Sequence, residues 1–236
     1  MRRTTTEQWH VHRNITGGAA RAAVFGMSDG LTTNVALILG VAGANPAAGV
    51  VRLAGVAGLI GGAFSMAAGE WVSMRAQAEL LERELDVERQ SLQASPEHEE
   101  RELVGIYRSR GIDHETAAAM ASQVMADPDR ALEVHAREEL GVNPGALGSP
   151  VSAALSSFAT FAVGALIPLV PWLFGHGRGM AIISVALAAV AALIVGGALS
   201  RFTGKGVVFS ALRQLGIAAV ASAVTFGLGV ALGAGH

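Results

Sequence analysis

The chain is built from long apolar stretches interrupted by one polar stretch. Five segments are apolar over enough residues to form a helix that crosses a bilayer, which takes about 20 residues. They lie near 22–44, 51–74, 150–174, 179–200 and 207–234. Residues 75–140 differ sharply, because they hold 16 of the 19 acidic residues. The pattern predicts an all-α polytopic membrane protein with five transmembrane helices and one acidic helical insert.

The same pattern divides the chain into four parts. Residues 1–21 form a polar N-terminal tail, 22–74 the first two spans, 75–148 the insert, and 149–236 the last three spans. Each boundary falls where the composition changes from polar to apolar or back.

Glycine, proline and capping residues predict the helices of the insert. Residues 70–95 contain neither Gly nor Pro, so we expect the second span to continue into the insert as one long helix. Beyond it, N-cap residues and terminating glycines predict short helices. The expected caps are Ser95, Asp113 and Asp127, and the expected ends are Gly111 and Gly141.

Composition narrows the class of protein. Only 15% of residues are charged, whereas soluble domains hold about 25%. There is no cysteine, which excludes disulfides, zinc ribbons and thiol catalysis. The net charge of −2 gives no basic field for binding nucleic acid. The N-terminal tail has no apolar core next to it, so we expect no cleaved signal peptide.

The basic residues predict the orientation in the membrane. Fifteen of the 17 lysines and arginines fall on one side of the predicted spans, and only Arg52 and Arg178 fall on the other. By the positive-inside rule, the N-terminus and the insert face the cytoplasm and the C-terminus faces away. The basic residues are nearly all arginine, which is associated with GC-rich bacterial genomes, so we expect a bacterial inner membrane.

The stretch GMSDGLTTN places Asp29 inside the first span. A carboxylate at mid-membrane costs roughly 2.5–3.5 kcal/mol on insertion scales, so a functional role is the default interpretation. The stretch also fits the G-x-S-x-G nucleophile elbow, but an elbow needs a preceding strand. A serine protease within the membrane would need a histidine base near Ser28, and the sequence offers only His176, on the far side. We therefore expect no enzyme.

A thioether lies at the depth of this carboxylate. Asp29 is eight residues inside Arg21, and Met66 is eight residues before Arg75, so both lie roughly 12 Å from the cytoplasmic edge. An oxygen and a sulfur donor together suit Fe²⁺ or another transition metal better than Mg²⁺ or Ca²⁺.

Two more residues continue this face towards the cytoplasm. Glu70 and Met74 follow Met66 at intervals of four, so the three share one helical face. The alternatives are that the methionines only pack and that Glu70 reaches to the interface.

The stretches RAAVFGMSDGLTTNVALILGVAGA and GGAFSMAAGEWVSMRAQAELLERE resemble the first two spans of the vacuolar iron transporter family. This family includes the yeast cross-complementer of calcium sensitivity and plant nodulin-21-like proteins. The resemblance implies a homodimer of five-span subunits in the lipid bilayer that moves Fe²⁺, and often Mn²⁺, out of the cytoplasm in exchange for protons. It also implies that Asp29 and Met66 line the transport path near the dimer interface and that Glu70 matches the Glu of an AGE motif.

The resemblance also implies metal ligands in the insert. The family carries two Glu-x-x-Glu pairs and a Met-Met-x-x-Glu run. The second pair matches Glu99 and Glu102, whereas the first pair keeps Glu88 and has Ser91 as its other member. The run falls on His135, Ala136 and Glu139, where His135 can replace a ligand and Ala136 cannot. The expected ligands are therefore Glu88, Glu99, Glu102, His135 and Glu139, with Glu84 and His98 as possible replacements.

Other interpretations of the insert stay open. Its acids could form a solvated face or pair with neighbouring arginines. No ferritin-like domain precedes the spans in this sequence, so iron oxidation is not implied. We expect no prosthetic group, with Fe²⁺, Mn²⁺, Co²⁺ or Zn²⁺ as the transported and insert-bound ion. The alternatives to proton-coupled transport are a membrane-anchored metal sensor or store, and an uncoupled cation channel.

Overall fold

The computed structural model describes residues 18–142 and 148–233, and within these ranges the chain forms eight α-helices and no strand. The helices that cross the predicted membrane are α1 (Gly18–Gly43), α2 (Ala48–Ala94), α6 (Pro150–Phe174), α7 (Arg178–Thr203) and α8 (Val207–Gly233). The insert contains α3 (Pro96–Ser109), α4 (His114–Met125) and α5 (Pro128–Glu138). The prediction of an all-α protein with five helices long and apolar enough to span a membrane is confirmed.

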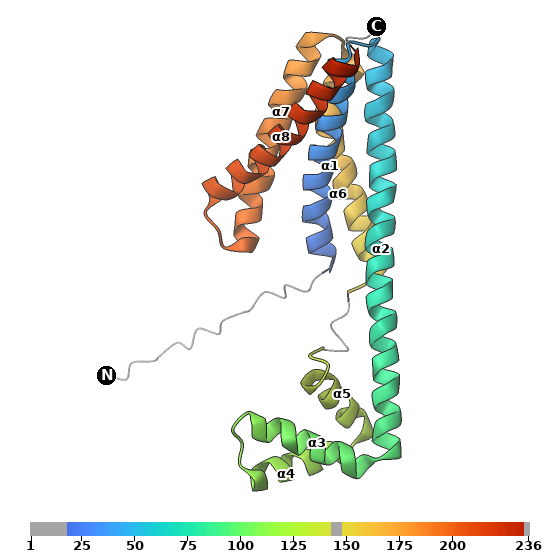
Figure 1. The fold of residues 1–236 in the computed structure, drawn as a ribbon, viewed down its shortest axis with the longest axis vertical. Coiled ribbons are helices and arrows are strands. Elements are labelled where there is room, and N and C mark those ends of the chain that lie inside the picture. The colour runs from blue at the N-terminus through green and yellow to red at the C-terminus, as the bar shows by residue number, and fades with distance from the viewer. Residues whose placement is uncertain (1–17, 143–147, 234–236) are drawn as a thin grey trace, which may run out of the picture.

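Helix α1 lies at the centre of the apolar bundle, in contact with α2, α6, α7 and α8. Figure 1 shows the five long helices gathered at one end of the molecule and the three short ones at the other. Many large apolar side chains on the outside of the bundle are exposed, among them Leu53, Ile182, Val220 and Leu232. A bilayer would cover this surface.

Small residues allow α1 and α6 to approach closely. A Cβ on Gly26 would overlap Thr160, one on Gly30 would overlap the Phe161 carbonyl, and one on Gly164 would overlap the Met27 carbonyl. Glycines facing one another across two helices are typical of membrane bundles, where packing and not water exclusion holds helices together.

Helix α2 is one unbroken helix of 47 residues. At 1.5 Å per residue it is about 70 Å long, roughly twice the 30 Å thickness of a hydrocarbon core. It therefore belongs both to the bundle and to the insert (Figure 1). The expectation of a continuous helix through residues 70–95 is confirmed, with the end at Ala94.

The insert has a small core of its own. Leu103 and Tyr107 of α3 pack against Ala117 and Ala121 of α4 and Ala131 of α5. Two of the three expected caps are confirmed: Asp113 accepts a hydrogen bond from the Thr116 N–H and Asp127 accepts one from the Asp129 N–H. Ser95 occupies the N-cap position of α3 but its side chain makes no capping hydrogen bond.

The ends of the spans lie within a few residues of those expected, with α1 and α7 each a little longer. Residues 1–17 of the predicted tail, 143–147 at the end of the predicted insert, and 234–236 lie outside the described residues. The sidedness in the membrane stays a prediction.

Candidate metal site and transport path

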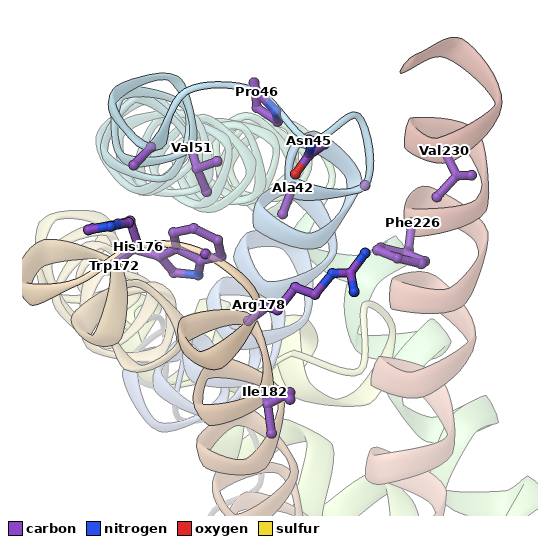
Figure 2. Close-up of a pocket in the computed structure, with 14 residues that line it drawn as sticks. Ala42, Asn45, Pro46, Val51, Trp172, His176, Arg178, Ile182, Phe226 and Val230 are labelled. Atoms are coloured by element: carbon purple, nitrogen blue, oxygen red, sulfur yellow. The ribbon is translucent and has the colours of Figure 1, made fainter. Parts of the chain in front are cut away.

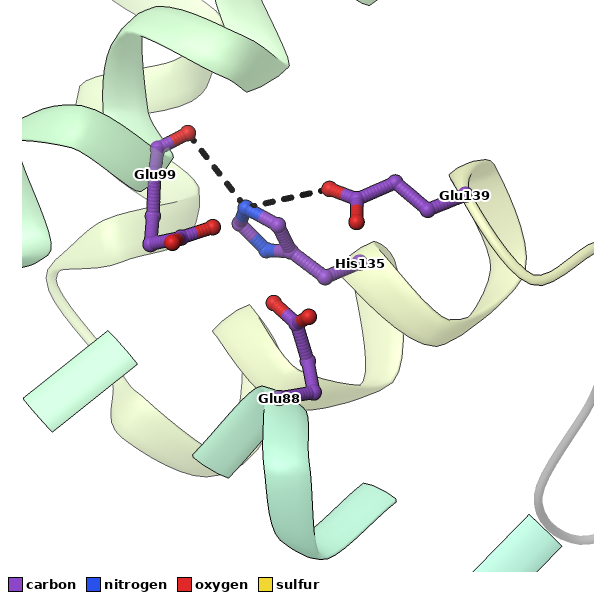
Figure 3. A group of neighbouring side chains, drawn as sticks. All are labelled: Glu88, Glu99, His135 and Glu139. Atoms are coloured by element: carbon purple, nitrogen blue, oxygen red, sulfur yellow. Dashed lines mark hydrogen bonds and ion pairs between the residues drawn. The ribbon is translucent and has the colours of Figure 1, made fainter. Parts of the chain in front are cut away.

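Four of the expected insert ligands lie together. Glu88 of α2, Glu99 of α3, and His135 and Glu139 at the end of α5 each offer a ligand atom, and these atoms all lie within 4.8 Å of one another. Figure 3 shows the three carboxylates arranged around the imidazole of His135. Residues 51 positions apart in sequence thus meet where three helices converge. Each of these residues was expected from the family resemblance.

His135 is held in one orientation at the centre of this group. Its side chain is fully buried, and its Nδ1 lies 2.9 Å from the Ala131 carbonyl one turn earlier. The carbonyl can only accept, so a proton on Nδ1 makes this a hydrogen bond, and in that tautomer the neutral ring has its lone pair on Nε2. Nε2 lies 3.9 Å from Glu139 Oε1. Nε2 also lies 3.4 Å from the Glu99 carbonyl oxygen (Figure 3). A backbone carbonyl on one ring nitrogen is the usual way in which the orientation of a metal-binding histidine is fixed.

The carboxylates of this group are partly buried and repel one another. Burial raises the pKa of the Glu139 carboxyl to about 7, with the Glu88 and Glu102 carboxylates adding to the rise and His135 opposing it. Burial likewise raises the pKa of Glu88, again with His135 opposing. One oxygen of Glu88 is buried without a hydrogen-bond partner. A divalent cation would satisfy this oxygen and remove the repulsion.

The other expected ligands lie outside the group of four. Glu102 is near enough to raise the pKa of Glu88 and Glu139 but is exposed. His98 is exposed and Glu84 is half-buried, and neither belongs to the group. Ala136 is fully buried. The donor set is thus three carboxylates and one imidazole, which suits Fe²⁺, Mn²⁺, Co²⁺ or Zn²⁺.

In the bundle, Asp29 lies on an exposed stripe of the central helix. This stripe consists of Phe25, Asp29 and Thr33, which are spaced four residues apart. All three are exposed, and the exposed fraction of Phe25 is 59%. The Asp29 carboxylate accepts a hydrogen bond of 3.2 Å from the Thr33 hydroxyl, and in the described residues no basic side chain pairs with it. A carboxylate at such a position is costly in a membrane, so Asp29 is a candidate functional residue.

The packing of α6 between the first two helices sets their relative height. Gly30 of α1 lies against the Phe161 carbonyl and Gly62 of α2 lies against the Phe161 ring. Counting along the antiparallel helices from this level puts Asp29 and Met66 within about 5 Å of each other along the bundle axis. Met66 itself is half-buried and packs on the Phe161 cluster. Within one subunit, therefore, the two residues share a level but face different surroundings.

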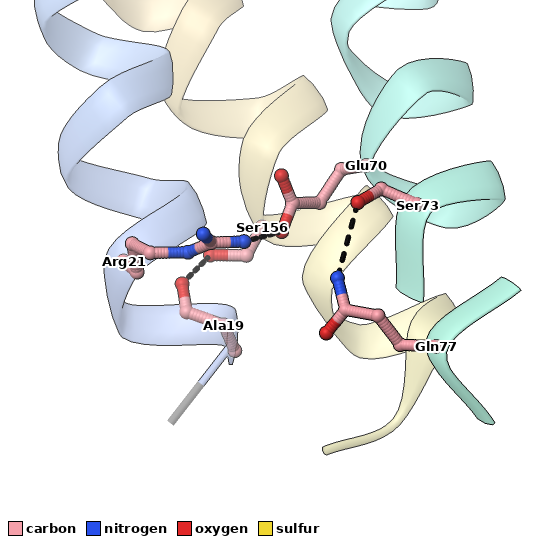
Figure 4. A network of polar contacts seen from close by, with 6 residues as sticks. All are labelled: Ala19, Arg21, Glu70, Ser73, Gln77 and Ser156. Atoms are coloured by element: carbon pink, nitrogen blue, oxygen red, sulfur yellow. Dashed lines mark hydrogen bonds and ion pairs between the residues drawn. The ribbon is translucent and has the colours of Figure 1, made fainter. Parts of the chain in front are cut away.

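Glu70 has a partner that the sequence did not identify. The Arg21 guanidinium of α1 donates to Glu70 Oε1 at 2.9 Å, and the carboxylate is only 17% exposed (Figure 4). Ser156 of α6 donates to the Ala19 carbonyl beside it and fastens the start of α1. Sequence reasoning used Arg21 only to mark the edge of the span, because a contact over 49 residues leaves no periodic signal. Met74, one turn further along α2, is half-buried.

These features define an integral membrane protein whose apolar five-helix bundle is joined by one long helix to an acidic helical module. Comparison with known proteins gives the family: the profile of the VIT family matches residues 20–230, and the chain belongs to this family. The resemblance predicted from the DGL and SMAAGE motifs is thereby confirmed.

Several relatives are similar over nearly the whole chain. A vacuolar iron transporter of Acanthamoeba castellanii is 36% identical over 215 residues, covering 91% of this chain and 78% of the relative. Vacuolar iron transporter 1 of Oryza sativa is 30% identical, covering 94% and 89%. Vacuolar iron transporter 1 of Arabidopsis thaliana is 31% identical, covering 92% and 88%. The relatives are transporters and not enzymes, in agreement with the expectation from Ser28 and His176.

Proposed function

We propose that this protein is a proton-coupled antiporter that moves divalent transition metal, Fe²⁺ and also Mn²⁺, out of the cytoplasm. The names of its relatives support iron as the cargo. The observation that carries the proposal is that a single helix, α2, bears both an insert ligand and the residues Met66, Glu70 and Met74 inside the bundle. A cation collected by the insert would thus be delivered along a continuous surface to the membrane.

The insert would act first. Its three carboxylates and His135 collect the cation, and Glu139, with its pKa near 7, gives up a proton when metal binds and takes one back when metal leaves. The cation then competes with the Arg21 guanidinium for the Glu70 carboxylate at the end of the bundle that faces the insert.

The intramembrane step would use Asp29 and Met66. The carboxylate supplies charge and the thioether supplies a soft donor, which together favour Fe²⁺ over Mg²⁺ or Ca²⁺. Protons arriving from the opposite side neutralise Asp29, release the metal and reset the site, and this provides the coupling.

A homodimer would complete this site. The stripe of Phe25, Asp29 and Thr33 is exposed in one subunit, and a second copy related by twofold symmetry would cover it with the same stripe. Two Asp29 carboxylates would then lie near the twofold axis and provide the charge that one subunit lacks.

Metal uptake into proteoliposomes tests the proposal. With the insert side outwards and an acidic interior, the parent protein is expected to take up Fe²⁺ and Mn²⁺, and collapse of the proton gradient is expected to abolish accumulation. Asp29→Asn removes the charge at nearly constant volume. It should reduce the uptake rate about tenfold or more, because a charge-assisted contact contributes about 1.5–3 kcal/mol.

Asp86→Asn is the matched control, because Asp86 is an exposed aspartate on the insert part of α2 and pairs only with Arg89. It should leave uptake unchanged. Uptake by Asp29→Asn equal to that of the parent would remove Asp29 from the path. Uptake that ignores the pH gradient would instead indicate an uncoupled channel.

The ligand cluster alone would also suit a membrane-anchored metal sensor or store. Deletion of residues 78–140 separates the two functions. A transporter is expected to keep part of its flux, since Asp29, Met66 and Glu70 remain, whereas a sensor or store would lose all metal binding.

A further inference from the structure

A pocket of roughly 610 Å³ opens at the end of the bundle opposite the insert. It lies between the α1–α2 turn, the α6–α7 turn and α8, and its lining includes Asn45, Trp172, His176, Arg178 and Phe226. Figure 2 shows Arg178 reaching from the start of α7 towards Phe226 of α8, with Trp172 and His176 on the other side. This pocket has no part in the metal path proposed above.

The charge of this end is uncompensated. Residues 30–69 and 140–236, which include this end of the bundle, contain no Asp or Glu. The two arginines that the positive-inside rule leaves on this side, Arg52 and Arg178, therefore have no acidic residue nearby in the sequence. In the described part of the chain neither makes an ion pair, and Arg52 Nε is buried without a hydrogen-bond partner. A bound anion would supply a counter-charge that the described residues do not.

Hydrogen-bond donors at the pocket are also unsatisfied. Trp172 is only 3% exposed, and its indole Nε1 is buried without an acceptor. A tryptophan N–H can only donate, and the described residues supply no acceptor for it.

The start of α7 adds further donors. Its N-cap is Gly177, which has no side chain to accept from the first N–H groups, and its first turn contains no acid. The N-terminus of a 26-residue helix carries partial positive charge and favours a bound anion. Arg178 is the first residue of that turn, so the guanidinium and the free N–H groups lie at the same place.

We propose that this pocket binds a phosphate group, either that of an anionic phospholipid or free inorganic phosphate. Arginine is the side chain best suited to bind phosphate because its planar fork matches two oxygens. His176 and the α7 N–H groups supply further donors. Below them the pocket is apolar, with Ile182, Phe226 and Val230 in its lining, as a lipid with its headgroup at the interface requires. The proposal is independent of the transported metal and of its direction.

Lipid and phosphate binding to the full-length protein in detergent tests the proposal. Native mass spectrometry and thermal unfolding are measured with added phosphatidylglycerol, with zwitterionic phosphatidylcholine, and with millimolar inorganic phosphate. We expect phosphatidylglycerol to bind and to raise the melting temperature more than phosphatidylcholine does. A matching effect of inorganic phosphate, with loss of the lipid preference, would assign the pocket to the soluble anion.

Four variants locate the effect. Arg178→Gln is expected to weaken binding of the preferred anion about tenfold or more. Arg178→Lys keeps the charge but not the planar fork of the guanidinium, and should weaken binding less. Lys205→Gln removes an exposed positive charge near the other end of α7 and should bind as the parent does. Trp172→Phe, which removes only the indole donor and part of the ring, should also weaken binding.

The proposal is overturned if Arg178→Gln binds phosphatidylglycerol and phosphate as tightly as the parent, or if Lys205→Gln loses as much as Arg178→Gln. If Arg178→Gln does not fold, Arg178→Lys and Trp172→Phe decide the question by the same comparison. A protein that shows no preference for either anion over phosphatidylcholine likewise contradicts it.

Discussion

At the scale of single residues, the environment of each acid sets its chemistry. Asp29 lies on an apolar surface and accepts only from Thr33. Glu70 lies at the end of the bundle and is paired with Arg21. Glu139 lies among other carboxylates and has a pKa of about 7. All three side chains are carboxylic acids, and their surroundings give them three different roles.

Glu139 predicts how metal binding depends on pH. Its carboxyl must lose a proton to bind metal, and with a pKa of about 7 this competition should weaken the apparent affinity of the insert about tenfold between pH 8 and pH 6. Titration calorimetry with Mn²⁺ or Co²⁺ measures it. Glu139→Gln should bind more weakly and with a shallower pH dependence, whereas Glu133→Gln, an exposed neighbour paired with Arg137, should retain both. An equally steep dependence in Glu139→Gln would contradict this role.

The same group affects stability without metal. Its folded pKa is raised above the ordinary value of 4.5, so the folded protein holds a proton that the unfolded chain releases. The stability it confers is present below about pH 4.5 and is lost as pH rises through about 7. The metal-free protein should therefore lose stability from pH 5 to pH 8, and bound metal should offset the loss above pH 7.

At the scale of elements, glycine positions decide how α1 and α6 pack. Both helices are apolar all round, so hydrophobic periodicity does not identify their contact faces. The faces are set by where backbone can approach backbone, at Gly26 and Gly30 on α1 and at Gly164 on α6. The pair Gly26 and Gly30 fits the small-xxx-small spacing in the sequence, but its partner helix was identified only by the structure.

Gly30 offers a test of this packing. A Cβ there would overlap the backbone of Phe161, which cannot move without shifting α6. Gly30→Ala should therefore lower the thermal stability in detergent by several degrees, since forced overpacking costs typically 1–3 kcal/mol. Gly216→Ala, on a part of α8 where a Cβ meets nothing, should be neutral or slightly stabilising because alanine favours helix. Equal stability of the two variants would show that the α1–α6 contact is looser than described.

At the scale of the whole molecule, one subunit leaves its most polar intramembrane stripe uncovered. Helix α1 contacts four other helices and still exposes Phe25, Asp29 and Thr33. The proposed dimer explains this exposure, because the stripe would be buried against its own copy. Apolar residues elsewhere on the bundle need no such partner, since lipid satisfies them.

Disulfide cross-linking tests the dimer directly. The chain contains no cysteine, so an introduced cysteine can form a disulfide only with the same residue of a second subunit. Phe25→Cys introduces one thiol on the stripe, and oxidation in membranes is expected to give a covalent dimer. Val220→Cys, at a similarly exposed position of α8 (65% against 59% for Phe25), should stay monomeric. Efficient cross-linking through Val220→Cys with none through Phe25→Cys would place the subunit contact on a different face.

The sequence by itself determined the helical class, the five spans, the continuous α2, two caps of the insert, and the family. These follow from local properties: apolar length, the absence of glycine and proline, and motifs of adjacent residues. It also singled out Asp29, Met66 and the insert ligands, from depth and from the motif match. Only the tertiary structure decided which acids meet around His135, that Arg21 neutralises Glu70, and that Arg178 and Trp172 share a pocket without an acid. Such contacts join residues tens to hundreds of positions apart, and their partners depend on how the helices pack, which no local pattern encodes.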